Sequence, residues 1–315
     1  MFLRYFLRRL LYVIPMLLVV TLVVFSLILL IPGDPVVALL GENATEEKIA
    51  QLRAELGLDQ PILVQYGQWL MKAVQGDLGR SIFTQEVVAE TVLKRLGVTL
   101  QLVILAVIIS FVLGVCFAVA SIWRPGSWLD HLARFIGTFG TAVPNFWLAM
   151  LLVLVFSVQL DMLPATGFVG IQENPLEFLR SAILPALALG AFGTAQITRQ
   201  FRSALLEVLD SDYIRTAFAK GLSRFAVIWR HGFRNAMLPV VTTVGLLFGN
   251  LLGATVVIET VFSIPGMGQL AVNAILQRDF TMLQGVVLVM VTMVLLINLV
   301  TDLIYAWLDP RIEYD

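Results

Sequence analysis

The sequence predicts an all-α integral membrane protein with six transmembrane helices, and three observations lead to this fold class. First, 59% of the 315 residues are hydrophobic and only 14% are charged, whereas soluble domains have an apolar share of roughly 45 to 50%. Second, six stretches provide the mainly apolar run of about 20 residues that a helix needs to cross a bilayer. Third, a polar and basic stretch between two of them, residues 210–239, has to lie outside the bilayer.

The six predicted spans differ in how apolar they are. The fourth is the most polar, because Arg199 and Arg202 lie in its second half, and we expect this half to leave the bilayer or to face other protein. In the third, Pro144 removes a backbone hydrogen bond and Asn145 is able to satisfy a freed group, so we expect a kink. The kink either borders a translocation path or serves helix packing alone. The spans are Leu10 to Ile31, Val98 to Ser121, Phe135 to Leu160, Ile183 to Leu206, Met237 to Phe262 and Gly285 to Leu308.

Basic residues assign the two sides of the membrane. If the N-terminus is inside, 13 of the 21 Lys and Arg residues fall in cytoplasmic segments, and the two short outer loops hold only Arg180 and Arg278. The other six lie in the long first outer segment, which the positive-inside rule largely exempts. We therefore expect both termini in the cytoplasm. The first span is expected to be retained, since its apolar core is too long for a signal peptide and no small-x-small cleavage site precedes Pro32.

The outer segment after the first span is predicted to form a small helical cap. Asn43 or Thr45 caps a helix that stops at Gly57, and Pro61 begins a second amphipathic stretch. This segment is too short for an independent domain. The chain thus divides into residues 1–32 (first span with cytoplasmic N-terminus), 33–97 (periplasmic segment), 98–308 (five-helix core with a cytoplasmic loop, 207–236) and 309–315 (cytoplasmic C-terminus).

The cytoplasmic loop is predicted to be a helix, a turn and a second helix at the membrane surface. Gly221 ends the first helical pattern, and the loop lies on the side where basic residues collect. A surface helix between two spans is where a membrane protein meets a soluble partner. The basic residues of the loop are Arg215, Lys220, Arg224, Arg230 and Arg234.

No motif for catalysis or metal binding occurs in the chain. Lys220 has no glycine-rich loop before it, so there is no P-loop for ATP, and neither a nucleophile elbow nor a zinc motif is present. The single cysteine, Cys116, lies in an apolar run and is expected to be a small buried hydrophobe. We therefore expect no enzyme activity, no metal, no cofactor and no nucleic-acid partner for this chain. Energy for transport then comes from another subunit or from an ion gradient.

Carboxylates inside the spans are the candidates for gradient-driven transport. Glu259 lies near the outer end of the fifth span, and Asp302 lies near the inner end of the sixth. Asn298 and Thr301 share a helical face with Asp302, which would suit a polar cavity. The alternative is that these residues bond neighbouring helices near the membrane ends, where charge is less costly.

Two segments of the cytoplasmic loop form a distinctive pattern: YIRTAFAKG from Tyr213 to Gly221, and RNAMLP from Arg234 to Pro239. The pattern resembles the cytoplasmic EAA loop of dipeptide and oligopeptide ABC-importer permeases, the inner-membrane components of binding-protein-dependent transport. Other segments that look like landmarks of this family extend the resemblance over nearly the whole chain. They are Pro32 to Pro35, Gly76 to Gly79, Ile183 to Pro185, Phe262 to Gly268 and Asp302 to Arg311.

The resemblance implies a type I ABC importer permease fold in the inner membrane of a bacterium. It also implies a second, homologous permease, two cytoplasmic ATPase subunits that use ATP and Mg²⁺, and a periplasmic or lipid-anchored substrate-binding protein. The expected substrates are peptides, although relatives take up glutathione, opines or nickel chelates. The residues implied in ATPase coupling are Asp212, Tyr213, Ile214, Arg215, Thr216, Ala217, Phe218, Lys220 and Gly221.

Two departures from the general importer pattern are typical of the peptide branch. Arg215, Thr216 and Ala217 occupy the places of Glu-Ala-Ala, and Pro239 lies further beyond Gly221 than in sugar importers. Phe218 stands where many members have a basic residue, so the docking surface has one cation fewer.

The physical character of the first loop helix also suits docking. Ile214, Ala217 and Phe218 share one side, and we expect them to enter a groove of the ATPase as apolar knobs. Arg215 and Lys220 then offer charge to the rim of the groove. The alternative is an amphipathic helix that rests on anionic membrane lipid.

Overall fold

The computed structural model describes residues 45–55 and 59–308, together with residues 11, 14–23, 25–26 and 36. Secondary structure in these residues is helical, apart from one isolated bridge between Arg80 and Val87. The chain divides into two compact units. Among the described residues, one comprises Leu100–Ile264 and residues 296–308, and the other comprises those between residues 11 and 99 together with Pro265–Leu295.

Within the described residues, four helices are long and apolar enough to cross a membrane: α5 (Val88–Trp123), α8 (Pro175–Leu209), α12 (Leu238–Val261) and α14 (Phe280–Leu308). They correspond to the second, fourth, fifth and sixth predicted spans. The first span lies partly outside the described residues. Its described residues 14–23 form a short apolar helix.

The third predicted span is broken at Pro144, the position where the sequence predicts a break, but the bend is much sharper than the expected kink. The chain forms α6 (Trp128–Ala142), turns by 113°, and continues as α7 (Asn145–Leu152) and the π-helix η1 (Val153–Gln159). Pro144 stands immediately before α7, where its missing N–H costs no helical bond, and its carbonyl accepts from Leu148 N at 3.1 Å. Asn145 makes no side-chain hydrogen bond within the described residues, so it does not compensate the break.

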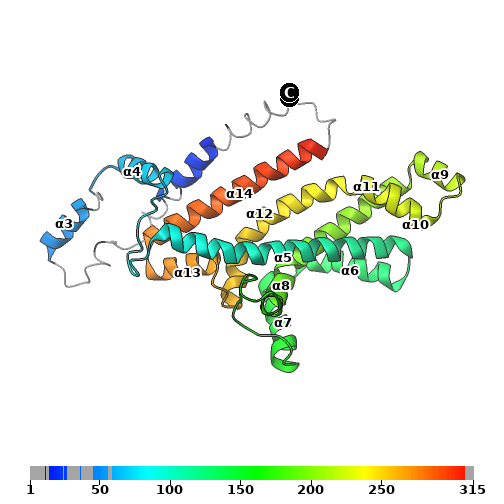
Figure 1. The fold of residues 1–315 in the computed structure, drawn as a ribbon, viewed down its shortest axis with the longest axis horizontal. Helices are drawn as coiled ribbons and strands as arrows, with labels where there is room; N and C mark the ends of the chain where they lie inside the picture. The colour runs from blue at the N-terminus through cyan, green and yellow to red at the C-terminus, as the bar shows by residue number, and fades with distance from the viewer. Residues whose placement is uncertain are drawn as a thin grey trace. The chain divides into compact units, whose positions relative to one another are not determined.

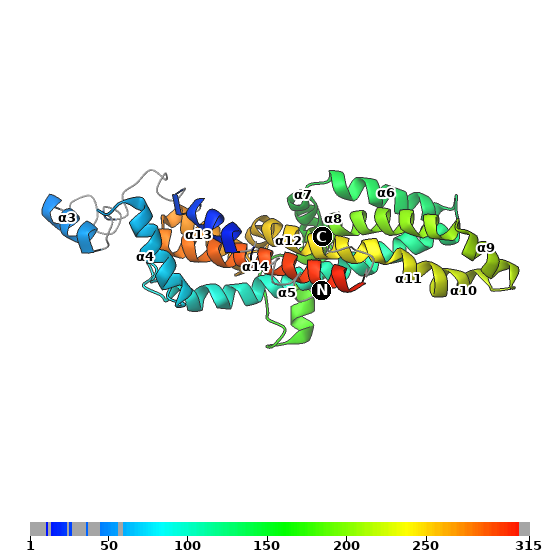
Figure 2. The ribbon, with the colours of Figure 1, turned by 90° about the horizontal axis from the view of Figure 1, so that it is seen from above.

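Helix α8 is the centre of the larger unit, because 67% of its most apolar stretch is buried. In both ribbon views α5, α6 and α12 run alongside it (Figures 1 and 2). A Cβ added to Gly193 would lie 2.4 Å from Leu247 Cδ2 and 2.8 Å from Ser110 Oγ, so glycine permits the close approach of α5 and α12.

The polar second half of α8 faces other protein, as predicted. The hydroxyls of Thr194 and Thr198 are buried and donate to carbonyls one turn earlier in the helix, at 3.0 and 2.7 Å. Arg199 packs its side chain beside Gly137 of α6, whose added Cβ would lie 2.9 Å from Arg199 Cγ. The fourth span is therefore polar where it contacts its neighbours within the unit.

The second unit contains the described part of the outer segment, with α3 (Glu46–Glu55) and α4 (Ile62–Val74) near their predicted positions. Thr45 precedes α3, whereas Asn43 and Gly57 lie outside the described residues. The end of the segment is attached to α14 and the preceding helix α13 (Met267–Gln277) through buried Asp279, whose carboxylate accepts from Ser81 Oγ and from Met282 N.

Candidate functional site

The loop between α8 and α12 folds into the predicted helical hairpin. Helix α9 (Asp212–Ala219) follows α8 after two residues. Gly221 then adopts φ +82°, which a side chain would disfavour, and Leu222 N donates back to the Ala217 carbonyl at 3.3 Å. Ser223 caps the returning helix α10 (Arg224–Ala226), and its hydroxyl accepts from Ala226 N at 3.3 Å.

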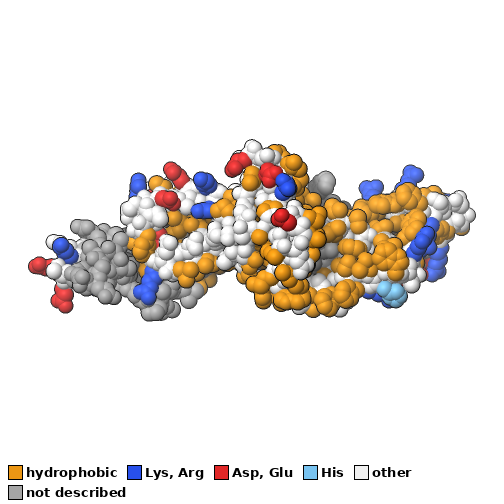
Figure 3. Space-filling view, turned by 90° about the horizontal axis from the view of Figure 1, so that it is seen from below, with side chains coloured by type: hydrophobic (Ala, Val, Ile, Leu, Met, Phe, Trp, Pro, Cys, Tyr) orange, Lys and Arg blue, Asp and Glu red, His pale blue; other side chains and the backbone are white. Residues whose placement is uncertain are grey.

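The second arm of the helical hairpin, which begins with α10, continues as the π-helix η2 (Val227–Gly232) and as α11 (Phe233–Ala236). Helix α11 leads into α12. Lys and Arg side chains gather around the end of the molecule that carries α9 and α10 (Figure 3). The loop is therefore a compact basic projection attached to two long helices.

An apolar cluster holds the hairpin together, and it corrects the predicted docking face. Ile214 is 0% exposed and Ala217 is 6% exposed, because both pack against Val227 and the partly buried Leu209 and Leu222. These two side chains are not available as knobs for a partner. The docking prediction for these two residues was wrong because the sequence of an eight-residue helix shows which side chains are apolar, but not which part of the protein covers them.

The exposed face of α9 offers two aromatic side chains. Tyr213 is 46% exposed and Phe218 is 45% exposed. Around them lie Asp212, Thr216 and Lys220, all exposed. Arg215 is also exposed, and its guanidinium lies 3.5 Å from the carboxylates of both Asp210 and Asp212. Tyr213 and Phe218 are about 140° apart around the helix, on either side of the buried Ile214 and Ala217. The exposed face of α9 therefore has an aromatic ring at each edge and charged side chains between them, a mixed composition that suits protein contact.

Polar contacts join the hairpin to neighbouring helices. Arg224 Nη2 donates to the carbonyl of Ile122 at 2.8 Å. Ile122 lies in the last turn of α5, where carbonyls lack helical partners and the helix dipole is negative. The ring of Phe225 meets that of Trp123 edge-on, with centroids 6.2 Å apart. Within the loop, Asn235 Nδ2 donates to the Tyr213 hydroxyl at 2.9 Å.

A buried carboxylate ties the same end of α5 to α6 and α8. Asp130 is 0% exposed, and its carboxylate accepts from Arg134 at 2.6 and 3.0 Å and from Gly126 N at 3.0 Å. Arg202 of α8 lies 3.5 Å from the same carboxylate and donates its Nε to Ser121 Oγ at 3.1 Å. The end that carries the hairpin is thus cross-braced between three helices.

The predicted pathway residues lie at the start of α7, near the end of α12 and on α14. Pro144 is exposed and Asn145 is half-buried, both at the break before α7. Glu259 is completely buried near the end of α12. Asn298 and Asp302 are half-buried on α14.

Glu259 and Asp302 lie beside different parts of α12. A Cβ added to Gly245, the eighth residue of α12, would overlap Thr301, so the first half of α12 contacts α14 beside Asp302. Glu259 is 14 residues further along α12, about 20 Å away at about 1.5 Å per helical residue. The two carboxylates therefore form no joint proton or ion site.

Other expectations concern single residues. Cys116 is exposed rather than buried, which corrects its interpretation as a core residue. No group of three His, Cys, Asp or Glu side chains suited to a metal occurs among the residues that the structure covers. Sequence reasoning missed Asp130 and Arg224 as anchors. The spacing of Ser127, Asp130 and Arg134 was an available signal, since it fits a capped helix start with an i, i+4 ion pair.

The sequence matches two related family descriptions over almost its whole length. "Binding-protein-dependent transport system inner membrane component" matches residues 110–314, and the N-terminal description of the same membrane component matches residues 2–103. The chain belongs to this permease family. It is thus a multi-pass membrane permease of the ABC transporter class, in agreement with the resemblance drawn from its loop.

Relatives and solved structures agree with this assignment. The dipeptide transport system permease protein DppB of Alkalihalophilus pseudofirmus is 42% identical over 332 residues, covering 99% of this chain and 100% of that protein. DppB of Escherichia coli is 40% identical over 336 residues, covering 99% of each. A chain of the inward-facing MetNI methionine ABC transporter has a TM-score of 0.56 and 19% identity, covering 69% of this chain and 96% of its own. This likeness shows the type I importer permease fold.

Proposed function

We propose that this permease is one subunit of an ATP-driven importer of peptides and that the exposed face of α9 docks on an ATPase subunit. One observation carries the proposal: the hairpin buries Ile214 and Ala217 against its own chain and leaves Tyr213 and Phe218 exposed on a braced projection. The relatives named dipeptide permeases support peptides as the substrate class. A second, homologous permease supplies the other half of the pathway.

The excess of basic residues supports a cytoplasmic position for the hairpin and both termini, with residues 33–97 on the outer face. Two ATPase subunits bind ATP and Mg²⁺, and a substrate-binding protein delivers peptide from outside. This chain supplies no catalytic residue, and residues 212–221 transmit motion.

Transmission follows from the way the hairpin is held. When the ATPases close, they displace α9 as a rigid body, because its apolar side is locked to Val227 and Leu222. The hydrogen bond from Arg224 to the Ile122 carbonyl makes the end of α5 move with the hairpin. The contacts of Asp130 with Arg134 and Arg202 make α6 and α8 move with it too. The helices then move together instead of the loop bending alone.

Gradient-driven transport by Glu259 and Asp302 is the weaker candidate function. Gly245, which lies beside Thr301, and Glu259 are separated by about 20 Å of helix in α12, which gives no support to a common site for a coupled ion. The docking hairpin would also have no purpose in such a carrier.

Purification with the neighbouring gene products tests the proposal. We expect two ATPase subunits and a second permease to remain bound in mild detergent, and we expect ATP hydrolysis to rise when binding protein and dipeptide are added together. Isolation of the chain alone, with no associated ATPase activity, would contradict the proposed function.

A further inference from the structure

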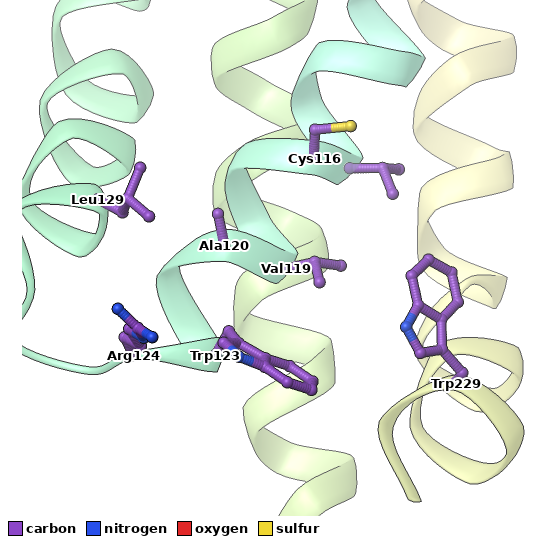
Figure 4. Close-up of a pocket in the computed structure, with 8 residues that line it drawn as sticks. Cys116, Val119, Ala120, Trp123, Arg124, Leu129 and Trp229 are labelled. Carbon is purple, nitrogen blue, oxygen red and sulfur yellow. The ribbon is translucent and has the colours of Figure 1, made fainter. Parts of the chain in front are cut away.

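An apolar groove lies beside the end of α5, close to the hairpin but separate from its docking face. Its volume is about 430 Å³, and one side is formed by the last turns of α5 (Figure 4). Leu129 of α6 and Trp229 of η2 supply the other walls. The residues of α5 and its end that line it are Val115, Cys116, Val119, Ala120, Trp123 and Arg124.

The groove has the composition of a lipid-facing site at a membrane interface. Trp123 and Trp229 are 38% and 45% exposed, and tryptophans gather where transmembrane helices reach the headgroups. Figure 4 shows the Trp123 indole directed toward the helix that carries Trp229, with Cys116 and Val119 further along α5. Hydrocarbon is therefore the chemistry that suits the groove walls.

One charged side chain lines the groove, and it is a cation. The guanidinium of Arg124 is exposed and has no hydrogen bond or ion pair within the described residues. The nearest buried carboxylate along the chain, Asp130, is engaged by Arg134 and Arg202. An anion from outside the chain would complement Arg124, because guanidinium binds phosphate oxygens in a bidentate manner.

We propose that this groove binds an anionic phospholipid, with an acyl chain between the two indoles and the headgroup phosphate on Arg124. The lipid fixes the relative positions of α5, α6 and η2 at the base of the hairpin. This inference rests on the groove alone and is independent of ATPase docking.

Photo-crosslinking of the intact transporter in nanodiscs tests the proposal. Phosphatidylglycerol or phosphatidylcholine with a diazirine in the acyl chain is added at equal fractions, and adducts are mapped by peptide mass spectrometry. We expect adducts on residues 115–129 and on Trp229 to be about fivefold more abundant with phosphatidylglycerol, which corresponds to about 1 kcal/mol for one basic side chain near an anionic headgroup.

Two variants separate the site from general attraction of anionic lipid. Arg124→Gln is expected to abolish the preference at the groove, whereas Arg180→Gln, which removes an exposed cation at the other end of α8, is expected to leave it unchanged. Equal labelling by both lipids, or a preference that survives in Arg124→Gln, would overturn the proposal. Absence of groove adducts with either lipid would also overturn it, by showing that another protein subunit covers the groove.

Discussion

Replacement of Arg224 by alanine should loosen the hairpin without changing the face that docks. The variant removes the bond from Arg224 Nη2 to the Ile122 carbonyl, which measures 2.8 Å and is partly buried. Hydrogen bonds to charged groups contribute roughly 1.5 to 3 kcal/mol when buried. Because Arg224 is exposed, we expect its hydrogen bond to Ile122 to contribute less than this range, about 1 kcal/mol. This free energy corresponds to an about fivefold larger population of the detached hairpin.

Hydrogen–deuterium exchange of the purified permease measures this population. Exchange of the backbone amides in α9 and α10 should be about fivefold faster in Arg224→Ala than in the unaltered protein, while exchange in α8 and α12 stays the same. The matched control is Arg234→Ala, since Arg234 lies in the same loop and makes no hydrogen bond or ion pair within the described residues. Its exchange should not change.

The transport assay extends the same prediction. In the assembled transporter, Arg224→Ala should raise the number of ATP molecules hydrolysed per peptide imported, because part of the displacement is lost in the hairpin. Unchanged exchange in Arg224→Ala, or equal acceleration in Arg234→Ala, would refute the reasoning that the Ile122 contact anchors the loop.

Three further changes test the site. Gly221→Val should uncouple ATP hydrolysis from import, because a β-branched residue at φ +82° costs roughly 1 to 2 kcal/mol. The control Gly76→Val, at φ +84° with equal free space, should import normally. Equal import by both variants would contradict a role for the turn. Phe218→Ala should weaken co-purification of the ATPase and leave amide exchange in the hairpin unchanged. Ile214→Ala should accelerate this exchange, because it removes a buried side chain worth about 2 to 5 kcal/mol. The reverse pattern would show that the docking face is misassigned. Asp130→Asn should lower the thermal stability measured by size-exclusion chromatography, by about 1.5 kcal/mol for weakened charge-assisted hydrogen bonds to a half-exposed Arg134, and an unchanged melting temperature would argue against the brace.

Local signals were sufficient to predict the hairpin and most spans. Gly221 marks a left-handed turn whose conformation depends on one residue, so its position could be read from the chain. The broken third span shows the limit of such signals. Pro144 identifies where the helix stops, but the 113° turn depends on packing against α8, where a Cβ added to Gly140 of α6 would lie 2.9 Å from the Ala195 side chain.

The anchors of the site depend on residues far apart in sequence. Asp130 and Arg202 are separated by 72 positions, and Arg224 and Ile122 by 102. No periodic pattern connects such residues, so only the tertiary structure brings them together. The same reason explains Ile214, which the sequence places on an apolar face and the structure covers with Val227 of its own chain.

The central claim is that the exposed face of α9 contacts an ATPase subunit. Because Cys116 is the only cysteine in the chain, Cys116→Ser combined with Phe218→Cys gives one reactive thiol on that face. A short thiol-to-amine cross-linker applied to the intact transporter should join this chain to an ATPase subunit, and a cysteine at Glu177 of α8, whose side chain is 45% exposed, should not. Absence of an ATPase adduct from position 218 in a transporter that still hydrolyses ATP in response to peptide would contradict the account.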